Sequence, residues 1–213
     1  MSSAPVLTRR RTREAPEVRR ARILDEAIRL IGERGYYGFT VQELAQRCGL
    51  TNPGLLHYYP SKLDLLLAAL AEMEVRSIAV MEPIVAAAER ELSGAHGREG
   101  VLAVLRSIIV GGTTSREMVR FLAELQAESL SPSHPAFTWW QRREAGMRDL
   151  FTRLLHPFLT DPEHVARQVI ALIDGLCLQW LRADGTMDIE AEWDRMLARM
   201  LPELHDNQGQ MTA

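Results

Sequence analysis

Apolar residues recur every three or four positions through most of the chain, which is the period of an amphipathic α-helix. No segment shows the two-residue alternation that is typical of a half-buried strand. The pattern predicts an all-α protein in which a series of helices is joined by short turns. We expect these helices at about residues 17–34, 41–47, 51–59, 61–81, 84–92, 101–109, 118–125, 136–158, 162–183 and 193–204.

The N-terminal part of the chain carries a series of helix start and stop signals. Thr40 precedes an apolar run and has Glu43 three residues later, which is the spacing of a capping box. Thr51 or Asn52 caps the next helix, and Pro60 ends it. Two short helices therefore meet through a tight turn, as in a helix-turn-helix.

The following helix begins at Ser61, which has Asp64 three residues later. We expect it to end near Met81, because Pro83 follows. Its predicted buried stripe is formed by Leu63, Leu66, Leu67, Leu70 and Met73. A helix of this length would join the N-terminal part of the molecule to the remainder.

In a helix-turn-helix, the first residues of the second helix face base edges in the major groove. Here these residues are small or polar, namely Thr51, Asn52 and Gly54. An asparagine amide matches the donor and acceptor of adenine. Gly54 has no side chain and would let the backbone approach closely. The pattern therefore indicates a DNA-reading unit.

Composition supports a globular protein, since 46% of the residues are hydrophobic and 25% are charged. No window approaches 18 consecutive apolar residues, so we expect no membrane span. We also expect no secretory signal, and Cys48 and Cys177 are interpreted as unpaired thiols in a cytoplasmic protein.

Charge is distributed unevenly along the chain. Residues 1–64 hold eleven basic and seven acidic side chains, which gives +4, whereas the whole chain has a net charge of −3. Only the N-terminal part is therefore expected to meet a polyanion. Residues 1–17 have no apolar period, and we predict a disordered basic arm. This arm is either a solvated tail or a tether to DNA, through Arg9, Arg10, Arg11 and Arg13.

The segment from Arg22 to Leu70 resembles the N-terminal domain of the TetR family of bacterial regulators. The matching stretch reads ILDEAIRLIGERGYYGFTVQELAQRCGLTNPGLLHYYPSKLDLLLAAL. The resemblance includes the aromatic-Gly-Phe-Thr entry, Gly49-Leu50, Leu56-His57-Tyr58-Tyr59 and Ser61-Lys62. It covers about 50 of the 213 residues. Asn52-Pro53-Gly54 falls where the family varies, so the operator sequence cannot be carried over.

This resemblance implies an all-helical homodimer that represses transcription from a palindromic double-stranded DNA operator. It implies phosphate contacts by Thr40, Thr51, Tyr58 and Lys62. Asn52 and Gly54 would face bases, with His57 beside them. For Tyr59, core packing and phosphate contact remain open. The predicted DNA-binding set is therefore Thr40, Gln42, Thr51, Asn52, Gly54, His57, Tyr58 and Lys62.

The expected organisation is a basic arm, a DNA-binding domain, a domain for ligand binding and dimerisation, and a disordered tail, over residues 1–17, 18–64, 65–205 and 206–213. The resemblance places the homodimer interface on residues 136–158 and 162–183. Gly175 within the second of these helices would allow close helix approach, either across that interface or inside the subunit.

An apolar and aromatic set could line a pocket for a small apolar or amphipathic effector. Ordinary core packing explains the same residues, which are Phe121, Leu125, Trp139, Trp140, Met147, Phe151 and Trp180. A repressor that an effector releases is the preferred function. A repressor or activator without an effector is the alternative.

More remote functions are an enzyme and a helical interaction protein. The six histidines form no metal-binding pair, and the sequence contains no phosphate loop or nucleophile elbow. We therefore predict no catalytic residue, no metal site and no cofactor.

Overall fold

The computed structural model describes residues 15–91, 97–184 and 186–205. The regular secondary structure of these described residues consists of helices joined by turns and contains no strand, which confirms the all-α prediction. The elements are α1 Pro16–Gly38, α2 Val41–Arg47, α3 Asn52–Leu56, α4 Lys62–Glu91, α5 Gly97–Gly112, α6 Arg116–Glu128, α7 Phe137–Leu155, α8 Pro162–Arg182, α9 Ile189–Met200 and α10 Pro202–His205. The predicted basic arm and tail lie largely outside the described residues.

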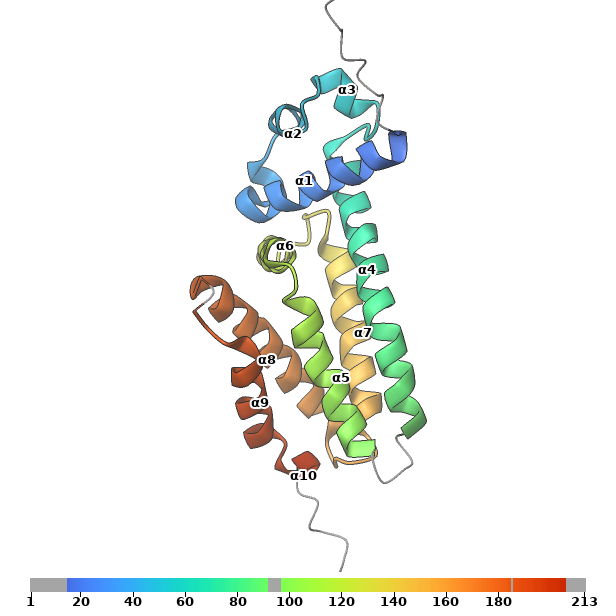
Figure 1. Ribbon diagram of the computed structural model, residues 1–213, viewed down its shortest axis with the longest axis vertical. Coiled ribbons are helices and arrows are strands. Elements are labelled where there is room, and N and C mark those ends of the chain that lie inside the picture. The colour runs from blue at the N-terminus through green and yellow to red at the C-terminus, as the bar shows by residue number, and fades with distance from the viewer. Residues whose placement is uncertain (1–14, 92–96, 185, 206–213) are drawn as a thin grey trace, which may run out of the picture.

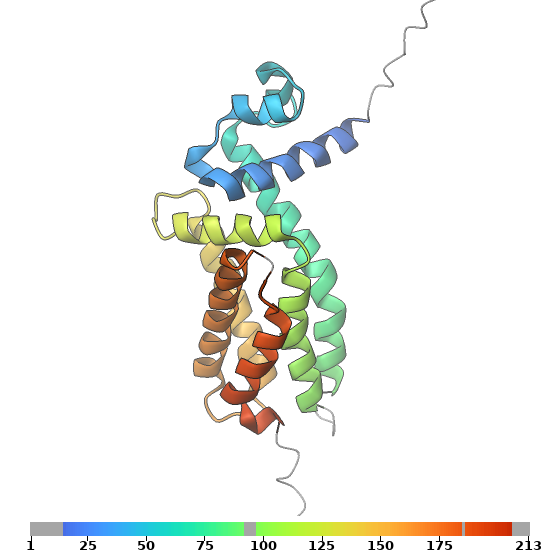
Figure 2. The ribbon, with the colours of Figure 1, turned by 60° about the vertical axis from the view of Figure 1, so that its left-hand side comes forward.

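The molecule is elongated, with a small head on a long helical body (Figure 1). Helices α1, α2 and α3 form the head, and α4 runs from the head along the length of the body. In a second view, α6 lies crosswise between α1 and the upper ends of the other body helices (Figure 2). The head therefore rests on α6 and is also joined to the body through α4.

Two apolar cores hold the molecule together. The first includes Leu30 and Leu44 of the head, but it also takes Phe121 and Leu125 from α6. The second lies within the body and includes Trp193, which is fully buried. Because α6 contributes to the core of the head, the two parts of the molecule share buried apolar surface rather than a flexible linker.

The structure corrects the predicted end of the long connecting helix. Helix α4 continues through Pro83 to Glu91, whereas the sequence pattern indicated two helices. A proline removes the hydrogen bond to the carbonyl four residues earlier, here that of Ala79. Both residues are exposed, so water can reach that carbonyl.

The buried face of α4 is also rotated from the predicted one. Leu63 and Leu67 are 43% and 48% exposed, while Leu65 and Ala69 are buried with Leu66, Leu70 and Met73. The run of three leucines at 65–67 fits two adjacent helix faces equally well. Packing against α1 and α5 determines which of these faces is buried, and the spacing of apolar residues along α4 alone does not.

None of the helices in the described ranges is long and apolar enough to cross a membrane.

Candidate nucleic-acid interface

The head contains two short helices that meet through a tight turn. Helix α2 begins after Thr40, whose Oγ1 accepts a hydrogen bond from the backbone N–H of Glu43 at 3.1 Å. Gly49 occupies the turn with a φ of +65°, a conformation that few other residues adopt without strain. The predicted cap and turn are confirmed, and together they fix the direction in which α3 leaves α2.

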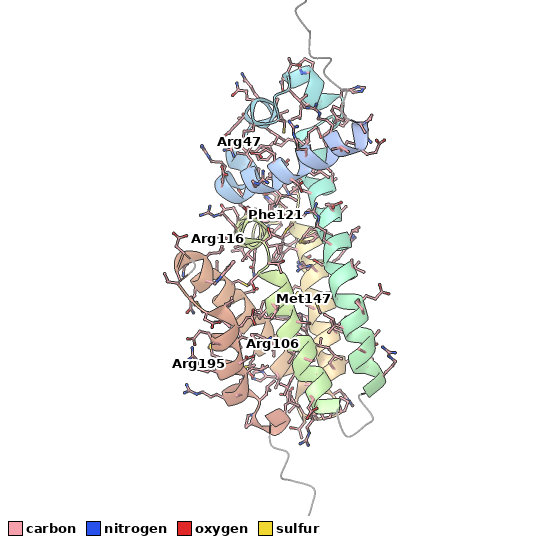
Figure 3. The ribbon with its side chains drawn as sticks, viewed as in Figure 1. Arg47, Arg106, Arg116, Phe121, Met147 and Arg195 are labelled. Atoms are coloured by element: carbon pink, nitrogen blue, oxygen red, sulfur yellow. The ribbon has the colours of Figure 1, made fainter. Side chains whose placement is uncertain are left out.

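Only half of the predicted capping box is formed at Thr40. Glu43 Oε1 accepts a hydrogen bond from Arg47 Nη2 at 3.3 Å instead of from the backbone N–H of Thr40. Arg47 also contacts Glu26 and Glu33 of α1, the latter at 2.7 Å. The hydrogen bond from Arg47 lowers the pKa of Glu33, and the same bond raises the pKa of Arg47. This ion cluster links α2 to α1, and its central residue, Arg47, is labelled in Figure 3.

Helix α3 presents its first residues to solvent. Thr51 caps the helix, because its Oγ1 accepts from the backbone N–H of Gly54 at 3.2 Å. The side chains of Thr51, Asn52 and Pro53 are exposed. A Cβ atom at Gly54 would lie 3.1 Å from Thr51 Oγ1, which is a tight contact. Glycine at this position therefore leaves room for the cap as well as for an approaching partner.

Most of the predicted DNA-binding residues are exposed on the head. Thr40, Gln42 and His57 are exposed like the start of α3, whereas Tyr58 is half-buried. Tyr59 is buried, and its hydroxyl donates to the carbonyl oxygen of Arg20 at 3.4 Å. Tyr59 therefore packs in the head.

Lys62 occupies a more enclosed position than its predicted role suggested. Its Nζ donates to the carbonyl oxygen of Phe39 at 2.7 Å, and it lies over the rings of Tyr36 and Phe39 at 4.9 and 4.4 Å from their centroids. Burial lowers the pKa of Lys62, and the carboxylate of Glu128 opposes this effect. The side chain stabilises the loop before α2, and a contact with a phosphate remains a prediction.

A polar contact joins the head to the body. The carboxylate of Glu128, at the end of α6, accepts from the backbone N–H groups of Tyr36 and Tyr37 at 2.7 and 3.3 Å. Gly35 makes this approach possible: its φ is +73°, and a Cβ atom there would lie 2.4 Å from a Glu128 oxygen. The buried ring of His134 packs edge-on against both tyrosines. The sequence pattern gave no indication of this contact.

Most of the predicted pocket residues are divided between the two apolar cores. Phe121 and Leu125 are buried in the first core and Phe151 in the second, as core packing requires. Trp139 packs against the first core, whereas Met147 and Trp180 pack against the second. Figure 3 shows Phe121 near the head and Met147 lower in the body. Glu124 of α6 lines a separate cavity.

That cavity has a volume of about 430 Å³ and lies between α1, α6 and α8. Its lining includes Glu33, Arg120 and Leu178. A second cavity of about 250 Å³ lies between α5 and α9, beside Arg106 and Trp193. None of the seven predicted pocket residues lines either cavity.

The exposed start of α3, the capped α2 and the tight turn define a helix-turn-helix DNA-binding protein with a helical C-terminal domain. Residues 23–69 match the bacterial regulatory proteins of the tetR family, and residues 97–206 match the BetI-type transcriptional repressor C-terminal domain. The second match alone spans just over half of the chain. The chain therefore belongs to the TetR family and is a DNA-binding transcriptional regulator, as the sequence resemblance implied.

Relatives of similar length support this assignment. The chain is 28% identical over 176 residues to the HTH-type transcriptional regulator BetI of Rhizobium meliloti (strain 1021), a match that covers 82% of this chain and 83% of the relative. It is 27% identical over 180 residues to the BetI regulator of Burkholderia thailandensis, with 82% and 88% of the two chains covered.

Solved structures show the same fold. AibR in complex with isovaleryl coenzyme A and operator DNA has a TM-score of 0.68 and 22% identity, and the match covers 86% of this chain and 98% of AibR. The regulator FadR from Bacillus subtilis, in complex with stearoyl-CoA, has a TM-score of 0.64 and 16% identity, over 86% and 98% of the two chains.

Proposed function

We propose that this regulator binds a palindromic DNA operator as a homodimer and that a small molecule bound in its C-terminal domain releases it. The observation that carries the DNA-binding role is the exposed start of α3 behind a tight, glycine-containing turn. Asn52 and Gly54 face the bases, with His57 beside them, and Thr40, Gln42, Thr51, Tyr58 and Lys62 contact the backbone or the groove edge. Because bacterial DNA is cytoplasmic, the protein works there, and no residue is assigned a catalytic role.

The dimer is proposed to form through the outer faces of α7 and α8. A Cβ atom added at Gly146 or at Gly175 would meet no heavy atom within 4 Å, so neither glycine serves a contact inside the subunit. On α8, Ala171 and Leu178 lie on the same face as Gly175 and are exposed. Such a face allows close approach of a second copy, and two-fold symmetry then explains a palindromic operator.

Leu178 offers a direct test of this interface. Leu178→Glu should convert the dimer to monomers in sedimentation velocity, because a charge would be buried at the interface. Met196→Glu is the matched control, since Met196 is 43% exposed on α9 and Leu178 is 38% exposed on α8. Dissociation by the Met196 change alone would place the interface on α9 instead.

Release by a small molecule is supported by the shared core at the junction. Any effector that changes the position of α6 must also move α1, because the two helices pack together and Glu128 bonds directly to the end of α1. By linkage, such an effector weakens DNA binding as much as DNA weakens effector binding. The structural relatives AibR and FadR are seen with acyl-CoA molecules, which supports a ligand in this domain.

Selection of bound fragments from a random DNA pool, at about 150 mM salt, tests the proposed function. We expect one palindromic sequence with two half-sites separated by about one helical turn. Recovery of unrelated fragments would contradict sequence-specific regulation. Recovery of a single unpaired half-site would contradict binding as a dimer.

A further inference from the structure

A layer of polar groups lies between the two apolar cores of the molecule. Along α7, Arg143 occurs one turn after Trp139, which packs against the first core, and one turn before Met147, which packs against the second. On the neighbouring helices, Gln126 of α6 donates to Asp174 of α8 at 2.7 Å. The interior is therefore polar at this level.

Arg143 is the cation of this layer, and it has no matching anion. In the part of the chain that the structure describes, no carboxylate oxygen lies within 4 Å of its guanidinium and no acceptor is hydrogen-bonded to it. Its partner is the ring of Trp139, whose centroid is 5.7 Å away. Burial lowers the pKa of Arg143, and the more distant carboxylates of Glu74 and Asp174 only oppose this effect. The side chain is half-buried, and its guanidinium is open to water rather than held by a protein acceptor.

A second donor in the same place is also unmatched. The indole Nε1 of Trp139 is buried, and it has no hydrogen-bond partner. Buried N–H groups normally have an acceptor, so an orphaned one needs an explanation. Arg143 and Trp139 lie four residues apart on the inner side of α7 and therefore on the same helix face. Two neighbouring donors on this face of α7, one buried and one open to water, therefore both lack an acceptor from the described part of the protein.

We propose that Arg143 and the indole N–H of Trp139 bind the anionic group, a carboxylate or a phosphate, of an amphipathic effector. Oxygen acceptors of this kind match the planar donor fork of arginine. The apolar part of the effector lies against Trp139 and Met147. This inference rests on the proposed release by an effector and gives that effector a chemical class.

The first test needs no ligand. Arg143→Met keeps a side chain of similar length and removes the unpaired charge, so the ligand-free variant should melt at the same temperature or about 2–4 °C higher. Residues held for binding are often poorly matched in the free protein. A purely structural arginine would give the opposite result, a lower melting temperature.

The second test uses three probes with the same eight-carbon chain: octanoate, octyl phosphate and octan-1-ol. Binding is measured by calorimetry on the full-length dimer. We expect at least one anionic probe to bind wild type about tenfold or more tightly than it binds Arg143→Met, because a charge-assisted hydrogen bond is lost. Arg143→Lys should retain part of the affinity, and Trp139→Phe should weaken the same probe. The preferred probe distinguishes a carboxylate from a phosphate head.

Equal binding of all three probes to wild type and Arg143→Met, including no binding to either, would overturn the inference. Operator binding by the ligand-free protein is measured in parallel. If that binding is sequence-specific and the probes do not discriminate, the inference fails while the regulatory function stands. If wild type prefers no DNA sequence, the regulatory function fails, whatever the probes show.

Discussion

Replacement of Glu128 by alanine tests whether the contact between head and body stabilises the whole molecule. The carboxylate accepts from the backbone N–H of Tyr36 at 2.7 Å and from that of Tyr37 at 3.3 Å. A hydrogen bond to a charged group contributes about 1.5–3 kcal/mol, and the longer, exposed bond contributes less. We therefore expect Glu128→Ala to lower the free energy of unfolding by about 2–4 kcal/mol.

Several details of the junction set the limits of that value. The side chain of Glu128 is 18% exposed, so water can partly replace it at the backbone N–H groups. The ring of His134 adds little, because its Nε2 lies 3.4 Å from the carboxylate and makes no hydrogen bond. The loss should appear as a fall of about 5–15 °C in the melting temperature, followed by circular dichroism at pH 7.5.

Glu124→Ala is the matched control for this experiment. Glu124 lies one turn earlier on α6, and within the described residues it forms no hydrogen bond or ion pair. Its replacement should change stability by less than about 0.5 kcal/mol. Glu128→Gln should fall between the two, because the amide keeps one acceptor oxygen. If Glu128→Ala were as stable as Glu124→Ala, the junction would depend on apolar packing alone.

Three further predictions concern pH and the head. Burial lowers the pKa of His134 below its ordinary 6.5 in the folded state, so the unfolded chain binds more protons. Stability should therefore fall as the pH drops below about 6.5, and His134→Asn should reduce this loss in pH-dependent melts. Thr40→Ala should cost about 0.5–2 kcal/mol by removing the cap of α2, measured by urea unfolding. Asn52→Ala should relax operator preference at one position in competition assays. Lys62→Ala should weaken binding to all sequences and reduce the slope of log affinity against log salt concentration by about one. Equal effects of both changes on every sequence would refute this division of roles.

The head was largely predictable because its signals are local. Caps act within three residues of their own position, and the two threonine hydroxyls at 40 and 51 accept the expected backbone hydrogen bonds. The glycine turn depends on a single backbone conformation. Local signals did not predict the partner of the Glu43 side chain. That side chain contacts Arg47, which also contacts Glu33 of α1.

The junction between head and body depends on contacts that are far apart in sequence. Glu128 and Tyr36 are separated by 92 residues, and neither has a local pattern that marks it. The sequence pattern predicts only that the first helix ends near residue 34, and it gives no indication of the positive φ at Gly35. In the structure this glycine also makes room for the Glu128 carboxylate, so its local role and its long-range role coincide.

One feature of the sequence, an arginine within an apolar stripe, indicates the polar layer of the body. Trp139, Met147 and Phe151 were each predicted to lie in the interior, and on a helix Arg143 falls on the same face, four residues from its two neighbours. An arginine within an apolar stripe calls for a partner, and the natural expectation is a carboxylate of the same domain. The nearby acid, Asp174, instead accepts a hydrogen bond from Gln126 at 2.7 Å. The feature that distinguishes a binding group from an ordinary buried ion pair is thus this missing partner, which only the packing of four helices reveals.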